Sequence, residues 1–297
     1  MTSDFAGLVD IGGGRQMFLQ CRGQGGPTVV LISGFGNPGG AWTVLPDGVA
    51  PPAVLPGVAG FTRVCAYDRP GTLLDAAAPD DQSRSDPIPQ PTTANAMVSD
   101  LHALLSAADV PGPYILAGHS FGGLLARLYA STYPDDVAGV ILVDAFSEGV
   151  RAGLTPEDWH TWTATNGVPS SALLAVHPDL EQIDINAAAD IMEQAATAHP
   201  LRPMPVAVLS AGLTGEMTPE QVAALPPGYP EALEAALRTN VAYLAGLVRA
   251  TRLTVVPDSG HYIQAEKPAI VIEAIRQVVE GVRNPDTWDD LVSCCTP

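Results

Sequence analysis

Short runs of apolar residues recur along this chain and alternate with segments of helical periodicity. Strand-like runs lie at residues 29–32, 63–67, 114–117, 140–143, 206–209 and 253–256. Apolar residues at helical spacing follow or separate them at residues 92–108, 231–250 and 269–282. Strands that alternate with helices imply right-handed crossovers. The pattern therefore predicts an α/β fold with a doubly wound, mostly parallel sheet.

Three stretches depart from this alternation. Residues 8–11 and 16–21 flank a glycine turn and predict two short strands. Residues 72–90 are rich in Asp, Pro and Ser and predict a long surface loop. No parallel strand is evident from residue 146 to residue 203, where the pieces that are periodic have helical spacing.

The long interruption predicts a separate subdomain. Helices inserted at the carboxyl end of a strand lie over the sheet edge where ligands bind in α/β folds. We therefore expect a core formed by residues 1–145 and 204–297, with a helical cap, or lid, formed by residues 146–203. Trp159 and Trp162 in the cap are candidates for an apolar substrate-binding surface.

Composition excludes several classes of protein. The chain has 297 residues, 46% of them hydrophobic and 15% charged, which favours a globular protein over a disordered one. A net charge of −18 disfavours nucleic-acid and anionic membrane partners. No apolar run reaches the ~20 residues of a membrane helix, and no signal peptide is visible. We expect a cytoplasmic monomer or homodimer acting on a small molecule; a secreted form with its signal removed stays an alternative.

The four cysteines have no metal-ligand spacing. Cys21 and Cys65 lie in strand-like apolar runs, so we interpret them as buried free thiols. Cys294 and Cys295 are adjacent near the end of the chain, and their role stays open. Cysteines this scattered favour a reducing compartment, and no metal is expected.

The apolar run at residues 114–117 leads into Gly118-His119-Ser120-Phe121-Gly122, and an Ala/Leu-rich helical stretch follows. Strand, Gly-x-Ser-x-Gly turn and helix together predict a nucleophile elbow. Such a turn strains the serine backbone and leaves its hydroxyl clear of the sheet. A Cβ at Gly118 or Gly122 would strike the neighbouring strand or helix. The alternative is an ordinary glycine-rich turn.

A serine nucleophile needs a base, and His261 is the best placed of the six histidines. It follows the last predicted strand, on a loop at the edge where Ser120 emerges. By strand alternation His119 points away from the nucleophile, so we expect it to pack or hydrogen-bond locally. The other four lie in helix or cap contexts and are interpreted as surface or packed residues: His102, His160, His177 and His199.

The acid that orients this base has two candidates. Asp144 ends the strand after the elbow, and neighbouring strands lie ~4.8 Å apart, which places it near an overhanging imidazole. The other position follows residues 206–209, where Glu216 is the only nearby carboxylate. We favour Asp144 and keep Glu216 as the alternative acid; a capping role for Asp144 also stays open.

Two backbone amides are expected to form an oxyanion hole. Phe121 N–H follows the nucleophile at the start of a helix. The second is expected from the glycine-rich loop after residues 29–32, with Phe35 N–H preferred and Gly34 or Gly36 as alternatives. A merely flexible turn is the other interpretation of this loop.

These segments together resemble the α/β-hydrolase superfamily, and within it the capped esterase-like serine hydrolases. The resemblance rests on the elbow and on residues 29–36, 67–71, 142–145 and 259–261. It implies acyl-enzyme catalysis by a catalytic triad without a metal or organic cofactor. Some dehalogenases and lipases among these relatives carry their acid at the place that matches Asp144, so the resemblance also favours Asp144 as the acid.

The chain also departs from the family pattern. Ser33 stands where many members have histidine, and the usual aspartate after residues 206–209 is missing. Capped relatives with an aspartate nucleophile, such as haloalkane dehalogenases and epoxide hydrolases, differ from this chain at Ser120. Asp68 and Arg69 are interpreted as structural turn residues.

The leading hypothesis is hydrolysis of an ester or lactone of a neutral, fairly apolar substrate. A second keeps the fold and changes the reaction to amide or peptide cleavage, carbon–carbon bond hydrolysis or hydroxynitrile lysis. An aminopeptidase would need cap carboxylates to hold the substrate amine, for which the candidates are Glu157, Asp158, Asp179 and Glu181. A third hypothesis is a ligand-binding module without catalysis.

Overall fold

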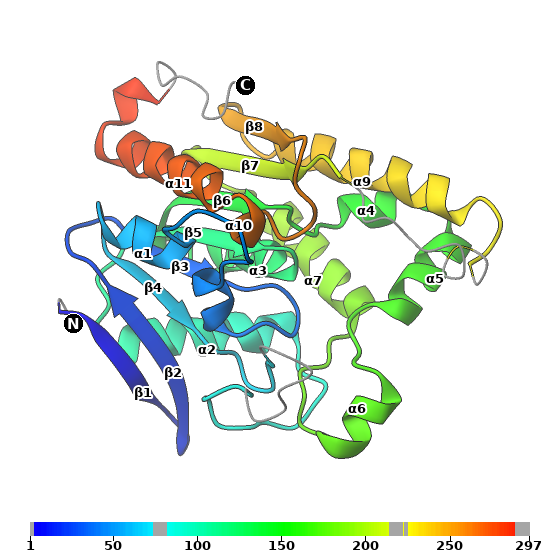
Figure 1. The fold of residues 1–297 in the computed structure, drawn as a ribbon, viewed down its shortest axis with the longest axis horizontal. Coiled ribbons are helices and arrows are strands. Elements are labelled where there is room, and N and C mark those ends of the chain that lie inside the picture. Colours follow the sequence, from blue (N-terminus) through cyan, green and yellow to red (C-terminus); the bar gives the residue numbers. More distant parts are fainter. Residues whose placement is uncertain (1–2, 74–81, 214–221, 223–224, 289–297) are drawn as a thin grey trace.

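An eight-stranded sheet forms the centre of the molecule, with strand order β1-β2-β4-β3-β5-β6-β7-β8 (Figure 1). The computed structural model describes residues 3–73, 82–213, 222 and 225–288. The strands are β1 (Phe5–Gly12), β2 (Arg15–Arg22), β3 (Thr28–Ile32), β4 (Val64–Tyr67), β5 (Tyr114–His119), β6 (Val137–Val143), β7 (Val206–Ala211) and β8 (Thr251–Val256). The pairs β1–β2 and β2–β4 are antiparallel and the others parallel. The predicted doubly wound, mostly parallel sheet is confirmed.

Helices cover both faces of the sheet (Figure 1). The described α-helices are α1 (Val54–Ala59), α2 (Ala94–Ala107), α3 (Phe121–Thr132), α4 (Gly149–Ala152), α5 (Pro156–Thr165), α6 (Ser171–Val176), α7 (Ile185–Ala198), α9 (Tyr229–Ala245), α10 (Ile263–Glu266) and α11 (Pro268–Arg283). Short 3₁₀ turns lie at Gly39–Thr43, Pro134–Asp136 and Pro285–Thr287. None of the helices in the described ranges combines the length and apolar character needed to cross a bilayer.

Two apolar cores explain why the strand-like runs are continuous rather than alternating. In β3, Val30 and Ile32 pack into a core with α2 and α3, while Val29 and Leu31 pack into a core with α1 and α11. All four side chains are fully buried. Residues of a strand covered on both faces are apolar on both, as the sequence pattern indicated.

The segment between β6 and β7 contains the helices α4 to α7, as expected. In this β6–β7 insertion, Trp159, Ile185 and Met192 are buried in the core that also contains α2 and α3. The helical content of the insertion agrees with the sequence pattern. The division into a core (1–145 and 204–297) and a separate cap (146–203) stays a prediction. Part of the predicted 72–90 loop lies outside the described residues.

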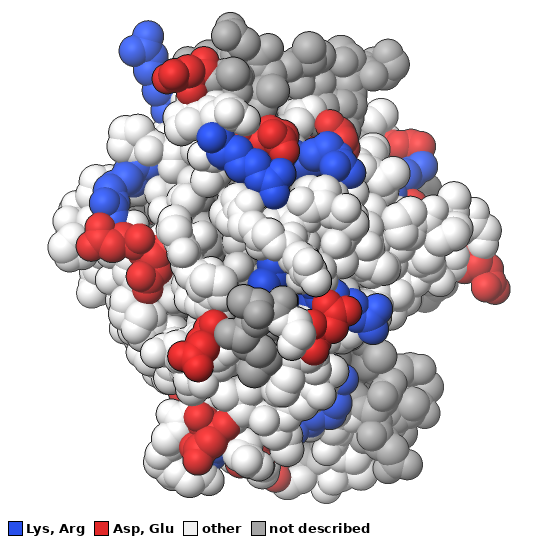
Figure 2. All heavy atoms as spheres, turned by 90° about the vertical axis from the view of Figure 1, so that its left-hand side faces the viewer, with Lys and Arg blue, Asp and Glu red and all other residues white. Residues whose placement is uncertain are grey.

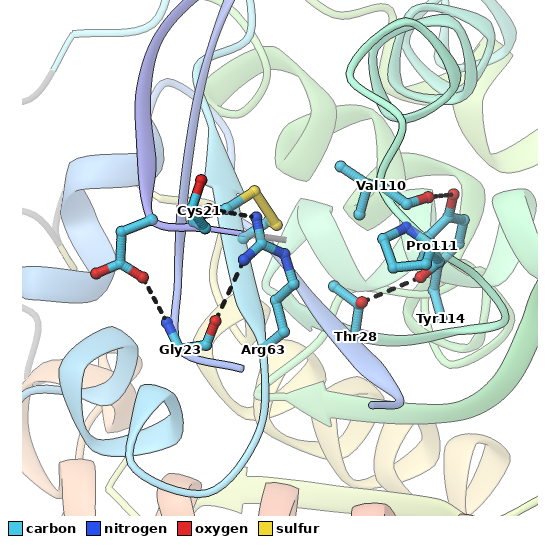
Figure 3. Close-up of a disulfide and its surroundings, with 10 residues drawn as sticks. Cys21, Gly23, Thr28, Arg63, Val110, Pro111 and Tyr114 are labelled. Atoms are coloured by element: carbon cyan, nitrogen blue, oxygen red, sulfur yellow. Dashed lines mark hydrogen bonds between the residues drawn. A yellow bond between two sulfur atoms is a disulfide. The ribbon is translucent and has the colours of Figure 1, made fainter. Parts of the chain in front are cut away.

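The interpretation of Cys21 and Cys65 as free thiols is wrong, because the two form a disulfide (Figure 3). Both are fully buried, as expected. The antiparallel register of β2 and β4 sets them directly opposite each other, with their Cα atoms 4.0 Å apart. The pairing joins residues 44 positions apart, so nothing local in the sequence indicates it. Cys294 and Cys295 lie outside the described residues.

Candidate active site

Ser120 stands at the turn between β5 and α3 in a strained backbone conformation. Its φ of 53° and ψ of −125° lie outside the regions that residues with a side chain normally adopt. Its N–H donates to Val143 O (3.1 Å), and its carbonyl accepts from Phe146 N–H (3.0 Å) and Gly123 N–H (2.9 Å). These bonds hold the strain in place. The strained serine predicted from the sequence is confirmed.

The two elbow glycines are required by close backbone approach. A Cβ at Gly118 would lie 2.3 Å from Gly122 O, and one at Gly122 would lie 2.2 Å from Ile32 O. Both distances are far below van der Waals contact. The helix α3 can therefore pack against β5 and β3 only with glycine at these positions, as predicted from the sequence.

Asp144 and His261 meet at the edge of the sheet next to this turn. Asp144 Oδ2 lies 2.6 Å from His261 Nδ1, and Asp144 Oδ1 accepts from Ala211 N–H (2.9 Å). Asp144 has a φ of 40°, and its own N–H donates to Leu209 O (2.7 Å). The end of β7 thus orients the carboxylate toward the imidazole. With Nδ1–H bound to the carboxylate, the neutral imidazole has its basic lone pair on Nε2.

His119 supports the loop that carries His261. Its ring is buried, and Nε2 lies 2.9 Å from His261 O. Burial, and secondarily repulsion from the His261 ring, lowers the pKa of His119 to about 3. His119 is therefore neutral and donates its Nε2–H to the His261 carbonyl. The expected local packing and hydrogen bonding of His119 are confirmed.

The loop after β3 runs directly over the nucleophile. A Cβ at Gly34 would lie 3.1 Å from Ser120 Cβ and 2.9 Å from His119 Nδ1. Gly36 N–H donates to Glu181 Oε2 (2.6 Å), so this amide is already engaged. In the part of the chain that the structure describes, Phe35 N–H and Phe121 N–H have no hydrogen-bond acceptor.

Behind this loop lies a buried ion pair that the sequence pattern did not indicate. The Arg69 guanidinium binds Glu181 through Nε–Oε1 (2.6 Å) and Nη2–Oε2 (3.0 Å), and both side chains are almost fully buried. Glu181 is therefore not available to hold a substrate amine. Arg69 makes internal contacts, as expected of a turn residue, and so does Asp68, which binds Arg84 (Nε–Oδ2, 2.7 Å) and accepts from Gly39 N–H (3.0 Å).

Ser33 occupies the position where many family members have histidine. Its hydroxyl is buried and donates to Pro38 O across the loop (2.9 Å). This bond closes the loop between β3 and the Gly39–Thr43 turn. A short polar side chain thus provides an internal contact that fixes the loop.

The two cap tryptophans form an aromatic stack with Phe146, just past Asp144. Trp162 stacks on Phe146 (ring centroids 5.1 Å apart) and on Trp159 (5.2 Å). Trp159 is 8% exposed and donates from Nε1 to Asn186 Oδ1 (2.6 Å). Trp159 is therefore mainly a packing residue, and a substrate-binding role for either tryptophan stays a prediction. Glu216, the alternative acid, lies outside the described residues.

Comparison with known proteins identifies the family. The model of the alpha/beta hydrolase family matches residues 29–274, which include β3, the elbow, Asp144 and His261. The chain belongs to the alpha/beta hydrolase family. Among the described residues of this family member, no group of three or more His, Cys, Asp or Glu side chains is arranged to hold a metal ion.

Individual relatives are distant. The protein YqjL of Bacillus subtilis is 29% identical over 140 residues, which are 47% of this chain and 48% of that protein. The chain spans less than half of the length of the first curated relatives that it matches. An esterase from Thermogutta terrifontis is similar in structure, with a TM-score of 0.57, 21% identity and coverage of 94% and 99% of the two chains. Est816, an N-acyl homoserine lactone degrading enzyme, has a TM-score of 0.56, 19% identity and coverage of 91% and 99%.

Proposed function

We propose that this protein is a serine hydrolase that cleaves an ester or lactone of a neutral, fairly apolar substrate. The observation that carries the proposal is the Asp144–His261 pair beside the strained Ser120. A serine hydroxyl becomes a nucleophile at neutral pH when a neighbouring imidazole takes its proton. No metal or organic cofactor is needed for this chemistry.

In the proposed reaction, Ser120 Oγ attacks the substrate carbonyl carbon while His261 Nε2 takes the hydroxyl proton. The carbonyl oxygen becomes an oxyanion, which Phe35 N–H and Phe121 N–H stabilise. The bond to the leaving alcohol breaks, and the imidazolium returns its proton to that oxygen. Water, activated by the same imidazole, then releases the acid from Ser120.

Each residue around His261 has a role in this cycle. Asp144, which Ala211 N–H holds in place, fixes the imidazole tautomer and stabilises the imidazolium. His119 anchors the backbone of His261, so this residue is held at its carbonyl by His119 and at its ring by Asp144. The free N–H groups of Phe35 and Phe121 are suited to oxyanion binding because no other described group uses them.

Ester or lactone cleavage agrees with the chemistry named for two structural neighbours. One structural neighbour is an esterase, and another degrades a lactone. Both are less than 25% identical to this chain, so they support the fold, and the choice of reaction rests on the site. Peptide-amine recognition loses one of its candidate residues, because Glu181 is bound to Arg69. A non-catalytic module would have no need for the strain at Ser120.

The test of this proposal is the loss of activity in triad variants. We expect the wild type to hydrolyse short p-nitrophenyl esters and to be labelled at Ser120 by a fluorophosphonate. Ser120→Ala should abolish labelling and lower kcat by roughly 10⁴-fold or more. Asp144→Asn should lower kcat by about 10⁴-fold, because the amide favours the wrong imidazole tautomer.

The Glu216→Gln variant is the matched control for the acid. It should keep wild-type activity if Asp144 is the acid. Loss of several orders of magnitude in Glu216→Gln alone would reassign the acid. Wild-type activity in Ser120→Ala would refute the proposed function.

A further inference from the structure

The buried Arg69–Glu181 pair lies where it can control the oxyanion hole. We propose that Arg69 and Glu181 are positioning residues, which hold the Gly34–Phe35 peptide so that Phe35 N–H faces the reacting carbonyl oxygen. Neither side chain touches the substrate in this proposal. The inference rests on the proposed function, because the oxyanion forms only if Ser120 is the nucleophile.

The hydrogen bonds of Arg69 carry the argument. Its Nη1 donates to Ser33 O (2.8 Å) and its Nη2 to Gly34 O (2.6 Å), so one guanidinium binds two consecutive carbonyls of the loop. The Gly34 carbonyl and the Phe35 N–H belong to the same peptide plane. In a trans peptide these two groups point in opposite directions. Fixing Gly34 O toward Arg69 therefore fixes Phe35 N–H away from it, on the other side of the loop.

The guanidinium charge also affects the strength of the amide as a donor. A charged donor on the carbonyl oxygen polarises the peptide, and chains of hydrogen bonds strengthen one another in a buried environment. The same bond that orients Phe35 N–H thus makes it a better donor to a developing negative charge. Orientation and polarisation both act in the transition state, where the oxyanion exists.

Glu181 fixes the guanidinium and the following peptide together. Besides its two contacts with Arg69, its Oε2 accepts from Gly36 N–H (2.6 Å). Burial lowers the pKa of Arg69, but the charge of Glu181 outweighs this effect and raises the pKa above its ordinary value. The guanidinium is therefore charged. Among the described residues, Phe35 N–H is the amide without an acceptor between two anchored peptides.

The pair also joins the β6–β7 insertion to the loop. Glu181 lies between α6 and α7, and its own N–H donates to Gly71 O (2.8 Å). A Cβ at Gly71 would lie 2.4 Å from Asp179 O, so the two backbones are in direct contact. The insertion therefore contacts the loop after β3 through the Glu181 carboxylate. Backbone contacts with Gly71 fix the position of Glu181.

A purely stabilising role would not require this arrangement. Buried ion pairs are weak contributors to stability, because the cost of desolvating the charges offsets their attraction. Arg127 and Glu148 form a second buried bidentate pair, with both N–O distances 2.7 Å, but Arg127 donates to no described carbonyl of the loop after β3. This second pair provides a matched control.

The experiment compares an ester with the corresponding thionoester, in which sulfur replaces the carbonyl oxygen. Sulfur is a poor hydrogen-bond acceptor, so the thionoester gains little from the oxyanion hole. The variants are Arg69→Lys, Arg69→Met and Glu181→Gln, with Arg127→Met as control. For each variant, kcat and KM are measured on both substrates, and folding is checked by thermal unfolding.

We expect Arg69→Met to lower kcat for the ester by about 10- to 100-fold, a smaller loss than removal of an oxyanion donor. Its KM should change by less than about 3-fold, and the ester-to-thionoester rate ratio should fall with kcat. Arg69→Lys should give the same direction, because an ammonium carries three donors on one nitrogen and cannot reproduce the four hydrogen bonds of the guanidinium. Glu181→Gln should give a smaller loss of the same kind.

An unchanged rate ratio in folded Arg69→Lys and Glu181→Gln would overturn the inference, as would an equal loss in Arg127→Met. If Arg69→Met fails to fold, those two milder variants decide. The proposed function fails separately, and this inference with it, if the wild type hydrolyses neither substrate and takes no fluorophosphonate label. Activity with an unaltered ratio would thus reject only the positioning role.

Discussion

Two residues of the site have strained backbone conformations, and a third contacts a charged and a neutral side chain. Ser120 and Asp144 both have positive φ, and both lie at the carboxyl ends of neighbouring strands, β5 and β6. His261 contacts both a carboxylate and a buried neutral imidazole, that of His119. Strain of this kind persists only where surrounding bonds enforce it. Here the backbone bonds of Ser120 and Asp144 to their neighbouring strands enforce it.

The lowered pKa of His119 predicts a pH-dependent stability. In the folded protein this pKa is about 3, against an ordinary value of 6.5. The unfolded chain therefore takes up the proton first, so the contribution of neutral His119 is complete above pH 6.5 and is lost as the pH falls toward 3. The expected loss is about 1.4 kcal/mol per pH unit in that window.

The measurement compares the urea unfolding free energy of the wild type and His119→Gln. Glutamine can still donate to His261 O but does not titrate. Between about pH 7 and about pH 5 the wild type should lose about 2 kcal/mol more than the variant. Parallel pH profiles would show that folding does not lower the pKa of His119.

At the scale of elements, the turn between β5 and α3 determines the position of the nucleophile. The strand is buried on both faces, and α3 packs across it and β3. Because Gly122 lies against the carbonyl of Ile32, the helix axis can approach the sheet closely. The N-terminus of α3 then lies at Ser120, where a helix end favours negative charge. The geometry of the oxyanion hole therefore depends on the packing of one helix.

Gly122→Ala should disturb the packing of α3 at this turn. A Cβ at 2.2 Å from Ile32 O forces α3 away from β3, and overpacking of this kind costs about 3 kcal/mol. Urea unfolding measures the loss of stability, and fluorophosphonate labelling of Ser120 should slow in parallel.

Gly246→Ala is the matched control. Gly246 ends α9 with a negative φ, and its nearest neighbour would be 3.5 Å from a Cβ, which is ordinary contact. The unfolding free energy of the Gly246→Ala variant should stay within about 0.5 kcal/mol of that of the wild type. Equal effects of the two substitutions would argue against close packing at the elbow.

At the scale of the molecule, the N-terminal antiparallel strands and the parallel sheet form one continuous structure. The Cys21–Cys65 disulfide crosses the boundary between them, from β2 to β4 (Figure 3).

Acidic and basic side chains are interspersed on the face shown in Figure 2, although the whole chain carries a net charge of −18. The disulfide removes the support that scattered free thiols gave to a reducing compartment, and the cytoplasmic location stays a prediction.

Removal of the disulfide should destabilise the whole molecule. The bond links residues separated by 44 positions, and in the chain-entropy model a closed loop of this size contributes about 4 kcal/mol. The double variant Cys21→Ala/Cys65→Ala should unfold at lower urea concentration than the oxidised wild type. A reductant should lower the midpoint of the wild type and leave that of the double variant unchanged. If Cys21 and Cys65 of the wild type react with a thiol reagent without prior reduction, the bond is absent.

The sequence by itself determined the elements of the fold and the positions of Ser120, Asp144 and His261 at one edge of the sheet. Apolar runs, helical periodicity and glycine spacing are local properties, so strand order along the chain was enough to place strand ends together. Only the tertiary structure decided the partners of Cys21 and Arg69, which lie 44 and 112 positions away. Those contacts depend on strand register and on where the β6–β7 insertion returns to the core. The same holds for Ala211 N–H on Asp144, because a backbone amide is the same in every residue and only its position in space gives it a role.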